Sequence, residues 1–235
     1  MSTPTVNMQR LKNLREFNGL LSDRVYAAIK AAILSFDFEP GAVLRKGPIC
    51  DALGVSRTPV SDAIIKLEAD RLVEVFPQSS TRVAKMSMKE IREDAFLREA
   101  LEVAAVEYTA LHRSDELLAR LNRSLRLQDL QVEDNDYEEL FKADQEFHRL
   151  ILGCCHIDRL HATVGLVSNH MDRARRLLLP VPGRSSDSVI EHRRIYKAIK
   201  ASDPDAARIA MQNHLRQLIK RLEPLEKQRP ELFVP

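Results

Sequence analysis

Four side chains that can bind a metal ion occur in the second half of the chain, in a pattern that directs them toward a common interior. Asp144 and His148 lie four residues apart within KADQEFHRLI, whose apolar residues predict a helix, so both share one helix face. His192 and His214 fall on the apolar faces of two further predicted helices. Three helices thus each direct a histidine toward the core, and one of them adds an aspartate.

This set of residues has the chemistry of a divalent metal site. An ionised carboxylate is costly to bury unless it is paired or metal-bound, and histidine is the commonest metal ligand. One carboxylate oxygen and three imidazole nitrogens suit Zn²⁺, Ni²⁺ or Mn²⁺ and leave room for water or an exogenous ligand. A single inward histidine is more often only hydrogen-bonded, but three with a correctly spaced aspartate favour the metal. We predict that one ion, zinc first and nickel or manganese as alternatives, is bound by Asp144, His148, His192 and His214.

Three basic residues in the same part of the chain are candidates for binding an anionic effector. Arg98 falls on an apolar helix face, and a buried arginine suits bidentate binding of a carboxylate. The alternative for Arg98 is an ion pair with Glu102 in the same helix. His170 and Arg175 flank an apolar stripe on another predicted helix and are weaker candidates for the same role.

The elements that must position these groups are helices. Ser87 and Glu90 form a capping box that opens a helix to about residue 112. Asp203 and Pro204 supply an N-cap and a first-turn proline for the last helix. After the first of these helices, the helical patterns cover about residues 115–131, 136–154, 158–179, 187–201 and, for the last helix, 204–222. This part of the chain is therefore expected to form an all-helical antiparallel bundle with the role of a sensor domain.

The composition agrees with a mostly helical protein and excludes several classes. Of 235 residues, 44% are hydrophobic and 30% are charged, glycine is sparse and tryptophan is absent. No apolar run approaches the roughly 20 residues that a membrane-spanning helix needs, and the polar start MSTPTVNMQR is no signal peptide. Three cysteines, two of them adjacent, are too few for a disulfide framework. These features predict a cytoplasmic protein without a membrane partner.

The first third of the chain has the pattern of a small DNA-binding module. Helices are predicted at about residues 22–36 and 48–53, the second ending at Gly54. The stretch VSRTPVSDAIIKLEADRLV predicts a third helix, whose buried stripe consists of Val60, Ile64 and Leu67. The runs LVEVF and TRVAK flank the turn PQSS and predict a two-stranded wing. The alternative is a generic helical bundle with a surface hairpin.

Polar residues opposite the buried stripe of the third helix predict contacts with DNA. Arg57, Thr58 and Ser61 lie near the start of this helix, where a recognition helix reaches base edges and phosphates. The charge distribution agrees weakly with this prediction. Residues 1–84 carry 11 lysines and arginines against 9 acidic residues, and the rest of the chain carries 25 of each. The positive excess therefore lies entirely in the N-terminal third.

The run VSRTPVSDAIIKLEADRLVEV, preceded by EPGAVL, resembles the winged helix–turn–helix of the GntR family of bacterial transcription regulators over about residues 18–84. The resemblance implies that DNA is contacted by Arg57, Thr58, Ser61 and Ser80. We add Arg45 and Lys46 as candidate phosphate contacts, because both are cationic and precede the second helix.

Four positions depart from the pattern of this family. Ser61 and Asp62 stand where members usually carry Arg and Glu. Ser80 stands where the resemblance places a glycine of the wing, and Arg71 replaces the glycine of the family's GLV. The departures affect individual base contacts and leave the expected winged helix–turn–helix intact.

The segments FLREALEVAAVEYTA, DQEFHRLI and EHRRIYKAIKASDPDAARIAMQNHL resemble the C-terminal ligand-binding domain of the FadR subfamily across about residues 88–222. Members with Asp-x₃-His and two later histidines bind a divalent metal in a helical bundle, and all four positions are filled here. A small carboxylate effector often lies beside or on that metal in the family. The resemblance implies both ligands for this chain, together with a homodimer that binds a double-stranded DNA operator.

These predictions divide the chain into an N-terminal tail (1–17), a winged helix–turn–helix domain (18–84), a helical metal- and effector-binding domain (85–224) and a C-terminal tail (225–235). The predicted function is a transcription regulator whose operator affinity is controlled by a small organic acid at or near the metal. The alternative is a regulator for which the ion itself is the signal. A metalloenzyme is the third class, since the site can activate water. Because the chain has no nucleophile motif and no general-base motif such as HExxH, we do not expect an enzyme.

Overall fold

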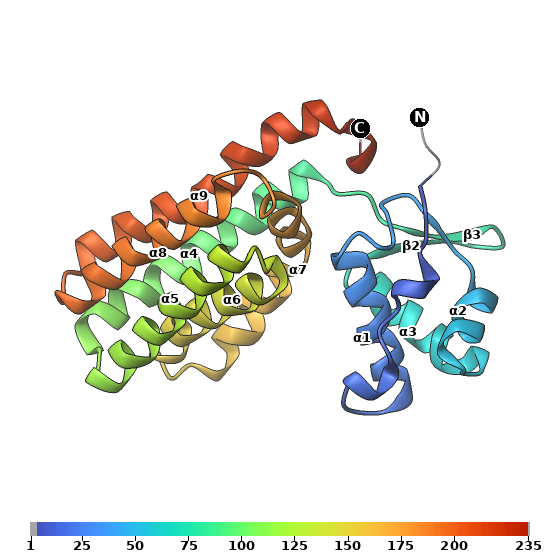
Figure 1. Cartoon of the computed structure of the whole chain (residues 1–235), viewed down its shortest axis with the longest axis horizontal. Coiled ribbons are helices and arrows are strands. Elements are labelled where there is room, and N and C mark those ends of the chain that lie inside the picture. Colours follow the sequence, from blue (N-terminus) through green and yellow to red (C-terminus); the bar gives the residue numbers. More distant parts are fainter. Residues whose placement is uncertain (1–3, 235) are drawn as a thin grey trace. The chain divides into compact units, whose positions relative to one another are not determined.

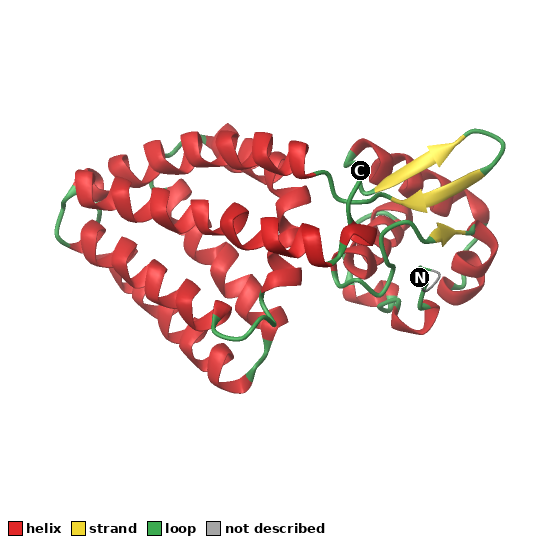
Figure 2. Cartoon of the chain, turned by 90° about the horizontal axis from the view of Figure 1, so that it is seen from above, coloured by secondary structure: helices red, strands yellow, loops and turns green. Residues whose placement is uncertain are grey.

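The computed structural model describes residues 4–234, without the side chains of Asn169 and His170. The chain separates into two compact units (Figure 1). The helical unit is Lys89–Pro224, and the winged unit consists of the residues before it and after it. Among the described residues, strands occur only in the winged unit (Figure 2). The predicted fold class, a mostly helical protein with a small N-terminal winged helix–turn–helix and a helical domain, is confirmed.

The winged unit has the predicted order of elements with one addition. Its helices and strands are α1 (Leu21–Leu34), β1 (Val43–Leu44), α2 (Lys46–Leu53), α3 (Arg57–Ala69), β2 (Val73–Phe76) and β3 (Ser80–Val83). Strands β2 and β3 form the predicted antiparallel wing, with Val75 opposite Thr81. Strand β1 pairs with the other side of β3, so the sheet order is β1-β3-β2. A strand of two residues has no periodicity, and the sequence therefore predicted only two strands.

Three turns of the winged unit place residues in the left-handed backbone region. Helix α2 ends at Gly54, where φ is 64°, as its sequence predicted. Arg71, which stands at a glycine position of the GntR pattern, has a φ of 54° directly after α3. At the tip of the wing the left-handed residue is Gln78, with a φ of 58°, whereas Ser80 belongs to β3. The conformation that favours glycine in this wing therefore lies two residues before the predicted position.

One hydrophobic core holds the winged unit together. The predicted stripe of α3 is buried in it, with Val60 and Leu67 fully buried and Ile64 4% exposed. Ile29 and Ile33 of α1 belong to the same core. The stripes of α1 and α3 thus bury each other, which explains why the i, i+4 spacing of apolar residues was sufficient to predict both helices.

The first residues of the chain also contribute to this core. Two short 3₁₀ helices, Met8–Arg10 and Leu14–Glu16, precede α1. Leu14 is buried in the core, and its carbonyl oxygen accepts a hydrogen bond of 2.8 Å from Arg24 Nε. Part of the segment predicted to be an N-terminal tail (1–17) therefore packs against α1.

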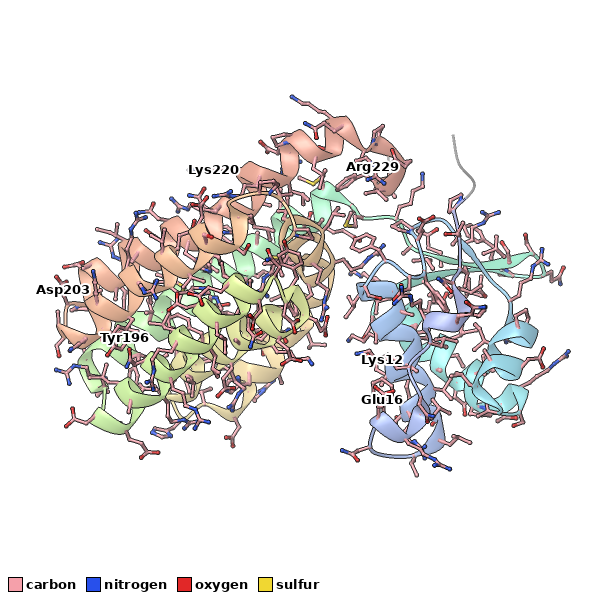
Figure 3. All side chains as sticks on the ribbon, viewed as in Figure 1. Lys12, Glu16, Tyr196, Asp203, Lys220 and Arg229 are labelled. Carbon is pink, nitrogen blue, oxygen red and sulfur yellow. The ribbon has the colours of Figure 1, made fainter. Side chains whose placement is uncertain are left out.

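The helical unit consists of long helices that lie side by side (Figure 1). Within the described residues they are α4 (Met88–His112), α5 (Asp115–Asp134), α6 (Tyr137–Gly153), α7 (Asp158–Leu178), α8 (Arg184–Lys200) and α9 (Pro204–Gln228). Asp203, labelled in Figure 3, caps α9 as predicted, because its Oδ1 accepts a hydrogen bond of 2.9 Å from Ala206 N. None of the described helices is long and apolar enough to cross a membrane.

The C-terminal residues 225–234 pair with the residues that precede α4. Helix α9 continues through Pro224 to Gln228, and a 3₁₀ helix follows at Pro230–Leu232. Met86 N donates a hydrogen bond of 3.0 Å to Leu232 O, and Val234 N donates one of 2.9 Å to Met86 O. Leu232 and Phe233 are buried. The segment that the sequence presented as a tail thus pairs with the winged unit.

This packing yields a prediction for stability. We expect Phe233→Ala to lower the free energy of unfolding by about 3 kcal/mol, because truncation of a buried phenylalanine removes apolar contacts and leaves a cavity. Phe233 is 2% exposed, whereas its neighbour Val234 is 38% exposed. Urea denaturation measures the loss, and hydrogen exchange assigns it to the winged unit. Val234→Ala is the matched control, and equal stability of the two variants would contradict this account of the C-terminal segment.

Candidate metal centre and DNA-binding surface

The three predicted histidine ligands meet in the interior of the helical unit. His148 lies on α6, His192 on α8 and His214 on α9, and all three are buried. His214 Nε2 lies 3.2 Å from His148 Nε2 and 3.2 Å from His192 Nε2. One nitrogen atom from each ring lies within 4.8 Å of the other two, so the triad could hold a metal ion.

Each imidazole is oriented by an acceptor on its other nitrogen. His148 Nδ1 donates to Glu102 Oε2 at 2.5 Å, and His214 Nδ1 donates to Glu191 Oε2 at 2.8 Å. His192 Nδ1 donates to Gln128 Oε1 at 2.7 Å. Because carboxylate and amide oxygens accept, the proton of each ring is held on Nδ1 and the lone pair of Nε2 faces the centre. This is the arrangement of outer groups found around metal-binding histidines.

The geometry of the triad fits a metal ion. With bonds of about 2.1 Å, two ligands of a tetrahedral ion lie about 3.4 Å apart, and adjacent ligands of an octahedral ion lie about 3.0 Å apart. Both separations from His214 Nε2, at 3.2 Å, fall in this range. With the protons on Nδ1, the Nε2 lone pairs that face one another at this distance repel, and a cation placed among them would remove that repulsion. The donor set therefore matches the chemistry of a divalent cation.

Asp144, the fourth predicted ligand, faces the triad with one of its carboxylate oxygens. Its Oδ1 lies 3.6 Å from His192 Nε2, close to the spacing of two ligands on one ion. Its Oδ2 accepts a hydrogen bond from Nη2 of Arg175. The Nη1 atom of Arg175 in turn donates to Asp172 Oδ1 at 3.1 Å. The Arg175 guanidinium is thus the cation that Asp144 binds in this structure.

Burial and neighbouring charges set the protonation states of His192, His214 and Glu102. Burial lowers the pKa of His192 and of His214 well below the ordinary value, and the surrounding imidazoles and arginines lower it further. Burial alone would raise the pKa of Glu102, but Arg98 and His148 more than offset it and hold that pKa well below its usual range. His192 and His214 are therefore neutral, and the Glu102 carboxylate that orients His148 is charged.

A small cavity lies next to the triad, on the side of Asp144. Its volume is about 20 Å³, which is room for roughly one water molecule. Its polar lining comes from Asp144, Arg175, Arg184 and Ser188, and its apolar lining from Phe141, Leu178, Leu179 and Leu218. Arg184 Nη1 lies 3.6 Å from Glu191 Oε2, longer than a hydrogen bond. The cavity is thus lined by two arginines and one hydroxyl that can donate hydrogen bonds to an anion.

The predicted effector residues differ in their surroundings. Arg175 lines the cavity. Arg98 is buried on α4, and its Nε donates to Glu102 Oε1 at 2.5 Å, which is the intrahelical pair weighed as its alternative. Arg98 still belongs to the site, because the other oxygen of the Glu102 carboxylate accepts a hydrogen bond from His148. His170 lies in α7, and its side chain is outside the part of the chain that the structure describes.

Three residues of the site had no role in the sequence analysis. Gln128 is fully buried on α5, and its position in one stripe with Leu121 and Leu125 was a usable signal of an inward amide. Glu191 and Arg184 gave no such signal. Both lie on α8, whose sequence is mostly polar, so no apolar stripe indicates which of its polar residues face the core. The packed structure shows that Glu191 contacts His214 and that Arg184 lines the cavity.

The predicted DNA-binding residues are distributed over α2, α3 and the wing. Arg57 and Thr58 are exposed in the first turn of α3. Lys46 Nζ donates a hydrogen bond of 3.0 Å to Ser61 Oγ, which brings the start of α2 against α3. Arg45 is exposed next to Lys46. Ser80 is half-buried at the start of β3. The structure thus joins Lys46 and Ser61 directly and places Ser80 on a different element.

A winged helix–turn–helix followed by a helical domain is the architecture of a DNA-binding transcription regulator. The family model for bacterial regulatory proteins of the gntR family matches residues 21–83, and the model for the FCD domain matches residues 95–217. The protein belongs to the GntR family and has an FCD domain as its C-terminal part. Regulators of this family bind DNA operators, and the relatives found are transcription regulators, in agreement with the prediction that the chain is not an enzyme.

Individual relatives match almost the whole chain. An HTH-type transcriptional regulator in an unstable DNA locus of Streptomyces ambofaciens is 31% identical over 221 residues, 94% of this chain and 93% of that protein. The HTH-type transcriptional repressor RspR of Escherichia coli is 24% identical over 91% of this chain and 93% of its own. The solved structure of E. coli McbR/YncC has a TM-score of 0.75 at 21% identity, covering 88% of this chain and 99% of that one. That likeness shows the shared fold.

The metal centre yields a graded prediction. His192→Ala removes a ligand, so we expect the variant to bind no zinc above background in elemental analysis after reconstitution. Gln128→Leu removes only the acceptor that orients His192, so we expect zinc affinity to fall by about 10–100-fold in a chelator competition. Gln131→Leu, one turn further along α5, is the control and should bind like wild type. Unchanged zinc binding in both His192→Ala and Gln128→Leu would leave the triad as ordinary buried histidines.

Proposed function

We propose that this transcription regulator binds its operator with an affinity controlled by a small organic acid, which binds at or beside a divalent ion held by Asp144, His148, His192 and His214. The observation that carries this proposal is the convergence of three oriented imidazoles, with His214 Nε2 lying 3.2 Å from the Nε2 atoms of His148 and His192, beside a cavity lined by arginines. Zinc is the proposed ion, since three imidazoles and one carboxylate complete a tetrahedral set and water or a ligand can enter as an additional donor.

The charges around the cavity favour an anionic effector. Arg98, Arg175 and Arg184 lie in or next to the site. The carboxylates of Glu102, Asp144, Asp172 and Glu191 lie beside them, so a divalent ion would leave one positive charge in excess. A carboxylate would offset this charge and can accept two parallel hydrogen bonds from a guanidinium. The apolar wall around Phe141 and Leu218 would bind a short hydrocarbon part of the same molecule. A small organic acid satisfies both parts of the lining.

Binding of such an acid requires a rearrangement. A cavity of about 20 Å³ holds no organic acid, and Arg175 occupies Asp144 Oδ2. If Arg175 transfers its hydrogen bonds from Asp144 to the incoming carboxylate, the cavity widens and both oxygens of Asp144 become available to the ion. Metal and effector would then bind with positive coupling, because each favours the same position of Arg175.

We propose that the residues in the first turn of α3 contact the bases of the operator. Arg57 and Thr58 are exposed there, and Lys46, Arg45 and Ser80 are proposed to contact the backbone or the adjacent groove. A single recognition helix offers few base contacts, so we propose a homodimer on a pseudo-palindromic operator. An effector would change operator affinity only if it binds the DNA-bound and free forms of the dimer unequally.

The effector half is tested by a thermal-shift screen of small carboxylates on zinc-loaded protein. We expect at least one acid to raise the melting temperature and to change operator affinity, since a ligand of the folded state at 100 times its dissociation constant adds about 2.7 kcal/mol. Arg184→Gln should weaken that acid at least about tenfold, because it removes a donor of the cavity. Arg193→Gln, on the same helix but paired with Asp129 at the surface, is the control.

The same screen distinguishes the alternative signal. If zinc alone changes operator affinity and none of the acids binds, the ion is the signal and the effector half of the proposal is wrong. If an acid binds but Arg184→Gln and Arg193→Gln bind it equally, the acid does not occupy the cavity next to Asp144.

The DNA half is tested by selecting an operator from random duplexes with the full-length protein. Arg57→Ala should then lower operator affinity by about 1–3 kcal/mol if Arg57 reads a base. Lys66→Ala is the control on the same helix, because Lys66 lies beyond the first turn and is paired with Asp23. Equal affinities of Arg57→Ala and wild type for the selected operator would contradict the assignment of α3 as the recognition helix.

A further inference from the structure

The excess of positive charge in residues 1–84 lies in the segment that precedes α1. Residues 1–20 carry three cationic residues, Arg10, Lys12 and Arg15, against the single acid Glu16. Residues 21–84 carry eight lysines and arginines and eight acidic residues. Because phosphate contacts by lysine and arginine supply most of the sequence-independent affinity for DNA, the surroundings of these three cations bear on operator binding.

The three cations of this segment have no partner among the residues that the structure describes. They are exposed, and their side chains form no hydrogen bond or ion pair there. The acid of the segment is occupied, since Glu16 Oε1 accepts a hydrogen bond of 2.9 Å from Asn13 N. Elsewhere in the winged unit, Lys30 and Lys66 are each paired with a carboxylate. The segment therefore presents three uncompensated positive charges.

Residues 4–17, which we call the N-terminal arm, are fixed to the winged unit (dark blue in Figure 1). Near the start of the arm, Val6 pairs antiparallel with Phe38, which follows α1. Near its end, Leu14 is buried in the core of the unit. Because the backbone of the arm is already held in place, a ligand of its cations would order only their side chains, which costs less conformational entropy than ordering a free tail.

The arm lies beside elements that are proposed to contact DNA. Its first 3₁₀ helix, Met8–Arg10, packs against α2. Helix α2 is the first helix of the helix–turn–helix, and in this motif that helix crosses the DNA backbone. Pro4 lies beside Gly41, whose carbonyl oxygen accepts a hydrogen bond of 3.3 Å from Nη1 of Arg82 in the wing strand β3. The arm thus extends from the base of the wing to the helix that borders the duplex.

We propose that the N-terminal arm is a further DNA-binding element, in which Arg10, Lys12 and Arg15 bind backbone phosphates next to the bases that α3 contacts. The inference rests on the proposed operator binding and extends its surface. The side chains suit this ligand, because a guanidinium can donate two parallel hydrogen bonds to phosphate oxygens and an ammonium binds them as a point charge. Double-stranded DNA is the partner, because the arm packs against a helix of the DNA-binding motif.

Phosphate contacts by the arm have a characteristic effect on binding. They position the protein and carry no sequence information, so they strengthen binding to all sequences alike. Each contact adds about 0.9 to the slope of log affinity against log salt concentration. In the proposed homodimer, two arms with three contacts each would contribute a slope of about 5. The arm is therefore expected to increase affinity and salt dependence without changing sequence preference.

A salt titration of the full-length protein on an operator selected from random duplexes tests the arm. We expect the triple variant Arg10→Gln, Lys12→Gln, Arg15→Gln to lose at least about tenfold in operator affinity at low salt and to show a salt slope smaller by about 5. The loss should be the same on a scrambled duplex. The matched control is Arg194→Gln, Lys197→Gln, Lys200→Gln, which removes the same charge from three exposed positions of α8 in the helical unit.

Hydroxyl-radical footprinting locates the contacts. Wild type should protect backbone positions at the flanks of each half-site, and the arm variant should lose that protection while its central protection remains. Because the three substituted side chains are exposed, circular dichroism and the melting temperature should stay unchanged.

Three outcomes would contradict parts of this account. Equal affinities and slopes of the two triple variants, or flank protection that persists in the arm variant, would overturn the arm and leave recognition by α3 standing. A loss confined to the selected operator would overturn the assignment to phosphates. A wild-type protein that selects no operator would overturn the proposed operator binding itself.

Discussion

The structure of the helical unit is organised around the burial of three imidazole rings that meet at one point. A buried polar group is costly unless it is hydrogen-bonded, and His214 Nε2 lies 3.2 Å from the Nε2 atoms of both His148 and His192, where the three rings could hold a cation. Each ring therefore needs an acceptor behind it, and α4, α5 and α8 supply Glu102, Gln128 and Glu191. With the histidines on α6, α8 and α9 and Arg175 on α7, each of the six described helices of this unit contributes a polar group to the site. The site constrains how nearly every helix packs.

Helix α4 links this centre to the rest of the molecule. Its inner face carries the pair of Arg98 and Glu102, and its outer face carries an apolar strip that the chain itself leaves exposed. In a regulator of this family, a ligand must alter the protein that binds DNA by favouring one of two states. Arg175, bound to Asp144, provides the competing cation on the opposite side of the site.

The winged unit is stabilised in a different way, by an apolar core without buried charge among its described core residues. Several of its turns use the left-handed backbone region. Gly54 adopts that conformation at little cost, whereas Arg71 and Gln78 adopt it at positions where glycine would be easier. Both ends of the chain add to this small unit, with Leu14 in its core and Phe233 paired with Met86. Because a small domain buries little surface, such additional packing is valuable.

By itself, the sequence determined the helices, the wing, the family resemblance and the four ligand-type residues on inward faces. All of these depend on local periodicity, such as the four-residue spacing of Asp144 and His148 on one helix. Only the tertiary structure decided which groups complete the site. Gln128 and His192 are separated by 64 residues and Asp144 and Arg175 by 31, and the short strand β1 acquires its partner only through folding. These partners depend on how helices rotate and pack against one another, and no short-range spacing in the chain encodes that.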